Sequence, residues 1–376
     1  MKIAVITNSR IPSLTANYIQ AMKVCQALKQ LGHDIRLFAP RETELAAWDS
    51  LLTHYGLGTT FEIMWLPSLP AFKRYDFTIH SILAARKFKA DLVYTWMLNP
   101  AVLALWLGWP VVLEMHAEVT GRLGPWLMRR FWRSSTHKRM LATTRPLRDT
   151  IETVAGLTFP EDAAQVAPNG VDLAQYESLP AAAEARRQLG LEEKATIGFT
   201  GHIYPGRGAD LLFELAGRIT DVNFLWVGGK PDEVAYWRDR LADAGASNVT
   251  MTGFVENSRL PLYQAAAEVL LMPYGRSISA SSGQDIAEVI NPMKMFDYMA
   301  TGRAIVSADL PVIHEVLNEN NAIFCEPGDV DVWERALREL LADEPRRSAL
   351  GAQARKDVAG YTWVARAQRA LDGFGK

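Results

Sequence analysis

The chain has 376 residues, 49% of them hydrophobic, which is enough for two domains that each bury a core. Its 40 basic and 42 acidic residues nearly balance, so overall charge favours neither a nucleic-acid-binding protein nor a highly acidic tail protein. Cys25 and Cys325 are typical of reduced thiols rather than of a disulfide framework or zinc site. Because the apolar run at the N-terminus is too short for a signal peptide, we expect a cytoplasmic protein.

The first half of the sequence alternates short apolar runs with helical patterns. These patterns predict a helix at 14–31 and strands at 2–7, 35–39, 62–66, 91–95 and 111–115. The longest apolar tract, 100–116, is broken by Gly108 and Pro110 and is shorter than a membrane span, so it predicts a buried helix and then a strand. Such alternation indicates a parallel sheet covered on both faces.

The same alternation restarts after a linker expected near 173–190. It predicts strands at 195–200, 222–227, 248–252 and 269–272, and helices at 208–219, 233–244, 259–267 and 363–371. We therefore predict an α/β protein with two doubly wound, Rossmann-like domains facing a central cleft. The expected domains are 1–175 and 176–358, followed by a C-terminal segment, 359–376, whose helix could pack back across the junction.

The stretch 290–311, INPMKMFDYMATGRAIVSADLP, predicts a helix followed by a buried strand. Asn291 suits the N-cap, Pro292 the first helical position and Gly302 the residue beyond the end. Lys294 in the first turn opposes the helix dipole, whereas a phosphate bound there would gain from the dipole, the amides and the ammonium. Asp297, one turn later, could accept hydrogen bonds from two ribose hydroxyls. The alternative is a solvated Lys/Asp pair.

A glycine-rich loop, GFTGHIYPGRGADLL at 198–212, connects a strand to a helix. Such a loop lets backbone approach phosphate closely, and Arg207 adds a forked donor for phosphate oxygens. A P-loop is disfavoured, because Arg207 and Gly208 stand where its lysine and its hydroxyl should be. A purely structural glycine turn is the remaining alternative.

The sequence offers no strong metal site. The Asp-x-Asp at 329–331 resembles a known metal-binding motif, but it precedes a helical pattern where acids favour a helix start. No His/Cys cluster has zinc spacing. We read the acids as helix capping and expect no metal and no cofactor.

Four segments together resemble a known family. They are PNGVD at 168–172, the loop 201–208, the stretch 291–311 and YTWVARAQRAL at 361–371. The set resembles the retaining nucleotide-sugar glycosyltransferases of family four, which have the GT-B fold of two Rossmann-like domains. The resemblance spans nearly the whole chain and is strongest from Ala167 onward.

The resemblance implies roles for individual residues. The family's glycine loop commonly has Gly-Arg and Lys-Gly, where this chain has Gly201-His202 and Arg207-Gly208. Of the family's two glutamates spaced by seven residues, Asp297 matches the second, while Val289 replaces the first beside Glu288. The implied contacts are with donor diphosphate for Gly201, His202, Arg207, Met293 and Lys294, with ribose for Asp297, and with donor sugar for Glu288 and Asn291.

His116 ends a strand in VVLEMHAE, where similar enzymes place a histidine beside the donor sugar; a lone histidine after a strand is otherwise often structural. The first loop of the family is often Gly-Gly, but here it reads NSRIPS at 8–13. We find no assignable carboxylate pair of the kind that a retaining hydrolase needs. The resemblance instead implies metal-independent transfer in which the leaving phosphate accepts the acceptor's proton on the same face.

The expected activity is therefore transfer of a sugar from a nucleotide-sugar donor, UDP- or GDP-linked, to a glycan, lipid-linked or small-molecule acceptor. A nucleotide-sugar epimerase of similar architecture and a non-catalytic nucleotide-sugar sensor remain alternatives. An NAD-dependent dehydrogenase is disfavoured because no complete G-x-G-x-x-G follows a strand.

The segment 122–139 has six basic residues and no acidic one, interleaved with Trp126, Phe131 and Trp132. Such a segment could rest on an anionic surface at the inner face of a membrane. A helix that packs its aromatic residues inward and solvates its arginines explains the pattern equally well.

Overall fold

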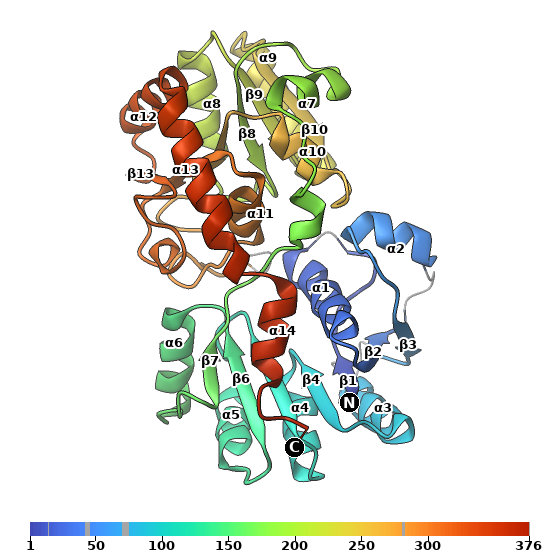
Figure 1. Cartoon of the computed structure of the whole chain (residues 1–376). Coiled ribbons are helices and arrows are strands. Elements are labelled where there is room, and N and C mark those ends of the chain that lie inside the picture. The colour runs from blue at the N-terminus through green and yellow to red at the C-terminus, as the bar shows by residue number, and fades with distance from the viewer. Residues whose placement is uncertain (14, 42–45, 70–74, 280–282, 376) are drawn as a thin grey trace. The chain divides into compact units, whose positions relative to one another are not determined.

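A computed structural model describes residues 1–13, 15–41, 46–69, 75–279 and 283–375. The chain forms two compact units (Figure 1). Unit 1 comprises Met1–Asn169 and Trp363–Lys376, and unit 2 comprises Gly170–Thr362. The sequence-based boundaries at 175/176 and 358/359 lie close to these changes of unit.

Unit 1 is built on a seven-stranded sheet in the order β3-β2-β1-β4-β5-β6-β7, in which every pair is parallel. Its strands are β1 (Lys2–Ile6), β2 (Asp34–Pro40), β3 (Glu62–Leu66), β4 (Leu92–Thr95), β5 (Val111–Met115), β6 (Lys138–Ala142) and β7 (Ala164–Val166). All residues of β4 and β5 are buried, as expected for central strands covered on both faces.

Helices of unit 1 contact each other in two series, consistent with coverage of opposite faces of the sheet. They are α1 (Ala16–Gln30), α2 (Trp48–Tyr55), α3 (Tyr75–Phe88), α4 (Leu98–Trp106), α5 (Gly124–Arg133), α6 (Arg145–Ala155) and α14 (Trp363–Leu371). Helix α1 contacts α2 and α14, whereas α3, α4, α5 and α6 contact each other in sequence. The last helix of the chain therefore covers the same face as the first.

Two buried arginines attach α14 to the rest of unit 1. Arg139 in β6 donates from Nη1 to the carbonyl oxygens of Arg369, Ala370 and Asp372, at 3.1, 2.9 and 2.7 Å, which satisfies the end of the helix. Arg366, inside α14, reaches Glu114 in β5. The C-terminal helix is thus an integral layer of unit 1.

Unit 2 has a six-stranded parallel sheet in the order β10-β9-β8-β11-β12-β13. Its strands are β8 (Thr196–Thr200), β9 (Asn223–Val227), β10 (Val249–Gly253), β11 (Val269–Met272), β12 (Ala304–Ala308) and β13 (Ile323–Cys325). Its helices are α7 (Ala182–Leu189), α8 (Ala209–Arg218), α9 (Pro231–Asp243), α10 (Leu260–Ala265), α11 (Met293–Thr301), α12 (Val330–Ala342) and α13 (Glu344–Asp357). The predicted pair of doubly wound α/β domains is confirmed.

Several elements differ from the sequence-based expectations. Strands β6 and β7 were not predicted, and the basic segment 122–139 is not one helix, because α5 ends at Arg133 and β6 begins at Lys138. The expected linker at 173–190 instead contains α7, which packs on α10.

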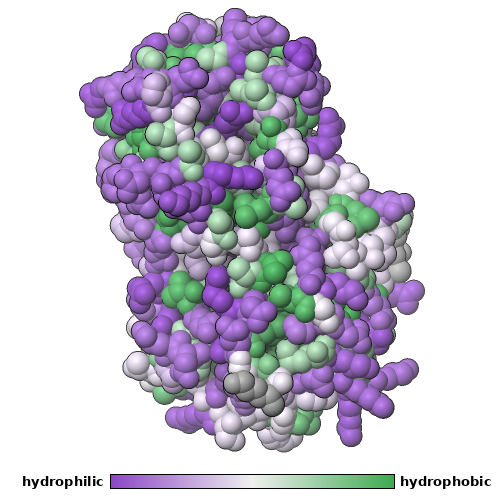
Figure 2. All heavy atoms as spheres, viewed as in Figure 1, coloured by the Kyte–Doolittle hydropathy of each residue, from purple (hydrophilic) through white to green (hydrophobic). Residues whose placement is uncertain are grey.

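On the face of the molecule shown in Figure 2, hydrophilic residues predominate and hydrophobic ones form scattered groups.

Candidate functional site

The order in which the chain adds strands to the sheet of unit 2 reverses at β8. From β8 the chain adds β9 and β10 on one side, then returns to add β11, β12 and β13 on the other. In open parallel sheets, ligands bind outside the carboxyl ends of the strands at such a reversal. The glycine-rich loop starts at this point, because β8 ends at Thr200.

The ammonium of Lys294 lies at this same end of β8. Its Nζ is 3.9 Å from the ring centroid of Phe199 in β8 and 5.7 Å from that of Tyr274, which follows β11. A Cβ added at Gly201 would lie 2.9 Å from the same Nζ. The ammonium therefore points at the start of the glycine-rich loop.

Lys294 Nζ is buried and has no hydrogen-bond partner among the described residues. Burial lowers the pKa of Lys294 well below its ordinary value, and the charge of Arg207 lowers it further, against a smaller opposite effect of Asp297. A buried cation without a hydrogen-bonded counter-charge is unfavourable unless a ligand supplies that charge.

Helix α11 carries Lys294 in its first turn, but its start differs from the prediction. Pro292, with φ −75° and ψ 130°, is the N-cap, so the prediction of Asn291 as the N-cap and Pro292 as the first helical residue is wrong by one position. Gly302 ends the helix at φ 68°, as predicted. The hydroxyl of Tyr298 accepts from the backbone N–H of Thr200 at 2.7 Å and so holds α11 against the end of β8.

At two positions of the loop, close packing against neighbouring backbone requires glycine. At Gly206 (φ 78°) an added Cβ would lie 1.9 Å from the carbonyl oxygen of Ser277, and at Gly208 (φ 92°) 2.0 Å from that of Pro273. No side chain fits at either place. The structural explanation of the glycine turn therefore holds for these two positions, whereas Gly201 faces Lys294.

Arg207 lies between these glycines and brings a second cation to the site. Its Nη2 donates to the carbonyl oxygen of Ser279 at 3.5 Å, and its guanidinium lies 5.7 Å from the ring centroid of Tyr274. Its Nε is buried without a hydrogen-bond partner among the described residues. Two neighbouring cations with unused donors are what an anion site requires.

The other residues of unit 2 that were predicted to bind the donor have different surroundings. The ring of His202 stacks on Tyr204 at 4.8 Å. Asp297 interacts with Tyr176. Burial, and then the charge of Asp297, raise the pKa of Tyr176 well above its ordinary value. Met293, the first residue of α11, is partly exposed.

The turn before α11 contains the two residues that were expected to contact the donor sugar. Glu288 is exposed, its neighbour Val289 is buried, and Asn291 is partly exposed. No contact of Glu288 joins it to the buried cations in the described part of the chain. Its predicted role stays a prediction.

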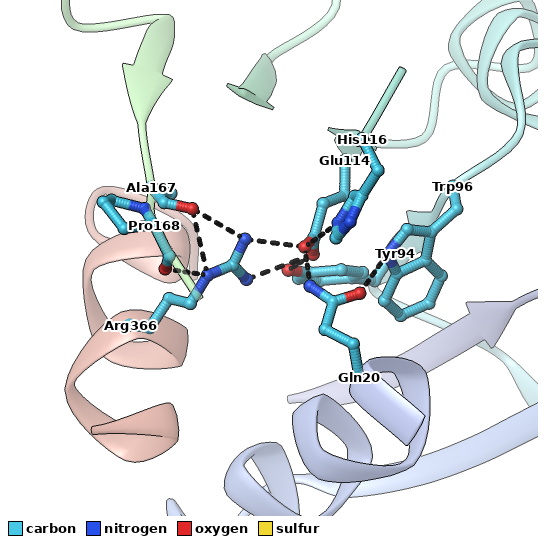
Figure 3. Close-up of polar contacts among 8 residues, drawn as sticks. All are labelled: Gln20, Tyr94, Trp96, Glu114, His116, Ala167, Pro168 and Arg366. Carbon is cyan, nitrogen blue, oxygen red and sulfur yellow. Dashed lines mark hydrogen bonds and ion pairs between the residues drawn. The ribbon is translucent and has the colours of Figure 1, made fainter. Parts of the chain in front are cut away.

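His116 follows β5 in unit 1 and is held by Glu114. Its Nε2 is 2.8 Å from Oε1 of Glu114, and its side chain is 12% exposed. Glu114 is fully buried and forms an ion pair with Arg366 (Figure 3). The histidine at the end of this strand is therefore oriented by a charged network rather than packed in an apolar core.

Sequence reasoning missed most of the supporting residues. Phe199 and Tyr274, which lie beside Lys294, and Tyr298, which holds α11 to β8, were indistinguishable from core aromatics. Glu114 did carry a signal, since a single acid within the apolar run VVLEM implies a buried charge with a partner. Its partner Arg366 lies 252 positions further on, which no local pattern could indicate.

The acids at 329–331 do what was expected of them. Asp329 caps α12 by accepting from the backbone N–H of Val332, which confirms the capping interpretation. Among the described residues, no three His, Cys, Asp or Glu side chains form a group that could hold a metal ion. No helix in that part of the chain combines the length and apolarity needed to cross a bilayer.

Comparison with protein families gives two matches. Residues 19–175 match the family described as Glycosyltransferase Family 4, and residues 194–343 match Glycosyl transferases group 1. Each match covers most of one unit. Together they include every predicted site residue.

Curated relatives are similar over part of the chain. A D-inositol 3-phosphate glycosyltransferase of Kineococcus radiotolerans is 27% identical over 232 residues, 56% of this chain and 51% of that protein. A GDP-mannose-dependent phosphatidylinositol monomannoside mannosyltransferase of Mycolicibacterium smegmatis is 28% identical over 212 residues, 54% of this chain and 52% of that protein. The matches thus span about half the length of these relatives.

Solved structures match over the whole chain. Anabaena HepE in complex with UDP has a TM-score of 0.75 at 15% identity, covering 99% of both chains. Sucrose-phosphate synthase from Thermosynechococcus elongatus has a TM-score of 0.76 at 16% identity, covering 98% of this chain and 96% of that one. These likenesses establish the fold. The two family matches, one in each unit, show that the chain belongs to the family-four type of glycosyltransferases, which have the GT-B fold.

Proposed function

We propose that the protein transfers a sugar from a nucleotide-sugar donor to a hydroxyl of a glycan, lipid-linked or small-molecule acceptor, with retention of anomeric configuration and without a metal. The observation that carries this proposal is the buried ammonium of Lys294, which faces Gly201 at the carboxyl end of β8 and has no hydrogen-bond partner in the described part of the chain. A diphosphate would supply the missing counter-charge.

Breaking the anomeric bond leaves negative charge on the diphosphate and an oxocarbenium-like sugar. Fixed donors aimed at that developing charge lower the barrier. In this proposal Lys294, Arg207 and the first amides of α11, including that of Met293, stabilise the leaving group, while Gly201 lets its oxygens approach and His202 adds a ring N–H. Asp297 accepts from the ribose hydroxyls, and His116 contacts the donor sugar, with Glu288 and Asn291 as further sugar contacts.

Two comparisons support a UDP- or GDP-sugar as the donor. One structural neighbour was solved with UDP, and one relative is GDP-mannose-dependent. A thermal-shift screen against UDP-, GDP-, ADP- and CMP-sugars should therefore give its largest shift with a UDP- or GDP-sugar. Mass spectrometry of the products then separates three functions. Slow release of free nucleotide without acceptor supports the transferase, an altered sugar still attached to nucleotide supports an epimerase, and binding without product supports a sensor.

We also propose peripheral contact with an anionic membrane through 122–139. Phe131 is buried and Trp132 stacks on Phe159 at 4.1 Å, so these two aromatic residues pack inward. Leu123 and Trp126, however, are 57% and 49% exposed near the start of α5. The same segment has four exposed arginines, namely Arg122, Arg129, Arg130 and Arg133, and the guanidinium of Arg130 lies 5.2 Å from the ring centroid of Trp126. Exposed apolar and basic side chains on one segment suit an anionic lipid surface.

Liposome pelleting tests this contact. The parent should sediment with vesicles containing phosphatidylserine and not with phosphatidylcholine alone, and Leu123→Ser with Trp126→Ser should reduce sedimentation. Trp106→Ser is the matched control, because Trp106 is 81% exposed at the end of another helix, α4. Equal sedimentation of the parent and the α5 variant would contradict the proposal.

A further inference from the structure

Glu114 collects hydrogen bonds from four side chains in unit 1. Tyr94 donates its hydroxyl at 2.5 Å, Arg366 donates from Nη1 and Nη2 at 3.2 and 2.6 Å, Gln20 donates from Nε2, and His116 Nε2 lies at 2.8 Å (Figure 3). These donors come from α1, β4, α14 and the residue that follows β5, so both carboxylate oxygens are occupied from several directions.

The partners of Glu114 are themselves held in place. Arg366 also donates from Nε to the carbonyl oxygen of Pro168 at 2.9 Å and from Nη2 to that of Ala167 at 3.1 Å. Trp96 donates from Nε1 to Oε1 of Gln20 at 2.9 Å. The network therefore has fixed geometry, and no partner of Glu114 is a mobile surface group.

The network also fixes the charge of Glu114. Burial alone would raise the pKa of this carboxyl, but the Arg366 guanidinium and the contact with His116 outweigh it and hold the pKa well below its ordinary value. The group is an ionised carboxylate, which can accept hydrogen bonds but cannot donate one.

This acceptor decides which nitrogen of His116 carries the proton. A ring nitrogen 2.8 Å from a carboxylate oxygen must be the N–H, so neutral His116 is the Nε2–H tautomer. Nδ1 then keeps its lone pair, and it has no hydrogen-bond partner among the described residues. The unprotonated nitrogen is left to accept from a ligand.

We propose that Glu114, clamped by Arg366, is the positioning residue of His116: it fixes the Nε2–H tautomer and so presents Nδ1 as an acceptor for a hydroxyl of the donor sugar. The tautomer claim concerns unit 1 alone, whereas the sugar clause rests on the proposed function. The alternative is that the buried pair only fastens α14 to the sheet.

The tautomer can be read directly from the full chain labelled with ¹⁵N-histidine. The protein has seven histidines, and His116→Gln identifies the signals of His116. The parent should show a protonated Nε2 and an unprotonated Nδ1 in long-range ¹H–¹⁵N spectra. Tyr94→Phe removes another hydrogen bond to the same carboxylate and should leave this tautomer unchanged. An Nδ1–H tautomer in the parent would overturn the proposal.

Loss of the carboxylate should release the tautomer. Glu114→Leu removes the acceptor oxygens but leaves Arg366 buried without its counter-charge, which can prevent folding, so the variant is also made with Arg366→Met to remove both charges. In whichever variant folds, the preference for Nε2–H should disappear. An unchanged tautomer in the double variant would show that Glu114 does not set it.

Kinetic measurements distinguish a Glu114 that positions His116 from a Glu114–Arg366 pair that only attaches α14 to the sheet. With the best nucleotide-sugar donor, the double variant should lower kcat by about 10- to 100-fold with little change in the donor KM, as expected for a misplaced group. In a His116→Ala background the same two substitutions should have little further effect. An equal loss in both backgrounds would mean that the pair is only structural. If the parent turns over no donor, the proposed function fails, and the tautomer spectra still decide the positioning claim.

Discussion

Replacing Lys294 by methionine should make the protein more stable and its donor binding weaker. Methionine is unbranched like lysine and one heavy atom shorter, and it removes a buried ammonium that has no hydrogen-bond partner among the described residues. Residues that serve a ligand often cost stability in its absence. The opposite signs of the two effects make this substitution informative.

The magnitude follows from the surroundings of Nζ. Burying a charge without compensation costs several kcal/mol, and the ring of Phe199, 3.9 Å away, returns about 1 to 2 kcal/mol. We therefore expect Lys294→Met to raise the free energy of unfolding by about 1 to 3 kcal/mol at neutral pH. For a folding unit of 150 to 250 residues, each kcal/mol shifts Tm by about 2 to 4 °C.

The gain should depend on pH with a definite sign. The folded-state pKa of Lys294 lies below its ordinary value of 10.5, so between these two values the unfolded state binds more protons and the parent gains stability as pH rises. The advantage of the methionine variant should therefore shrink as pH rises toward 10.5. Chemical denaturation of both proteins at several pH values measures this difference.

Binding should change in the other direction. Loss of a charge-assisted contact to diphosphate should weaken UDP or GDP binding by about 1.5 to 3 kcal/mol, roughly one to two decades, in calorimetry. Lys194→Met is the matched control, since it removes an exposed lysine of the same unit. A methionine variant at position 294 that is less stable than the parent, or binds nucleotide equally well, would refute the reasoning.

The other predictions concern unit 2 and the two cysteines. Asp297→Ala should weaken donor binding by about 1.5 to 3 kcal/mol through lost hydrogen bonds to ribose, and unchanged affinity in calorimetry would refute that role. Gly208→Ala should lower the free energy of unfolding by several kcal/mol, because its Cβ would lie 2.0 Å from the Pro273 carbonyl oxygen at φ 92°; denaturation that matches the parent would contradict this. Cys25 and Cys325 are 0% and 1% exposed, and burial raises the pKa of the Cys25 thiol and brings that of Cys325 to about 12. Both should react with Ellman's reagent only after denaturant is added, and rapid labelling of the native protein would show that either one is accessible.

The order of elements was largely predictable because central parallel strands are continuous apolar runs. Strand β5 and helix α14 lie where their patterns place them. Strand β6 was hidden because its sequence, KRMLA, opens with the last two members of a basic run, so charge masked the apolar core of the strand. Local composition does not reveal that the basic segment 122–139 contains both α5 and the start of β6.

The candidate site could be located from the sequence where its charged residues lie within one helix turn. Lys294 was identified because a first-turn lysine opposes the dipole. The cap was misplaced by one residue, since the fixed φ of Pro292 suits both the N-cap and the first helical position. The surrounding aromatic rings come from β8, the end of β11 and α11 itself, so their convergence depends on sheet order, which residue spacing does not encode.

The pairing of Glu114 with Arg366 has a consequence for synthesis of the chain. The strands of unit 1 leave the ribosome first, yet the guanidinium that neutralises the carboxylate in β5 is made 252 residues later, after all of unit 2. Until then the nascent sheet holds an acid that must stay hydrated or protonated. Unit 2 is continuous and can mature meanwhile, so the half of the protein that is translated first is completed last.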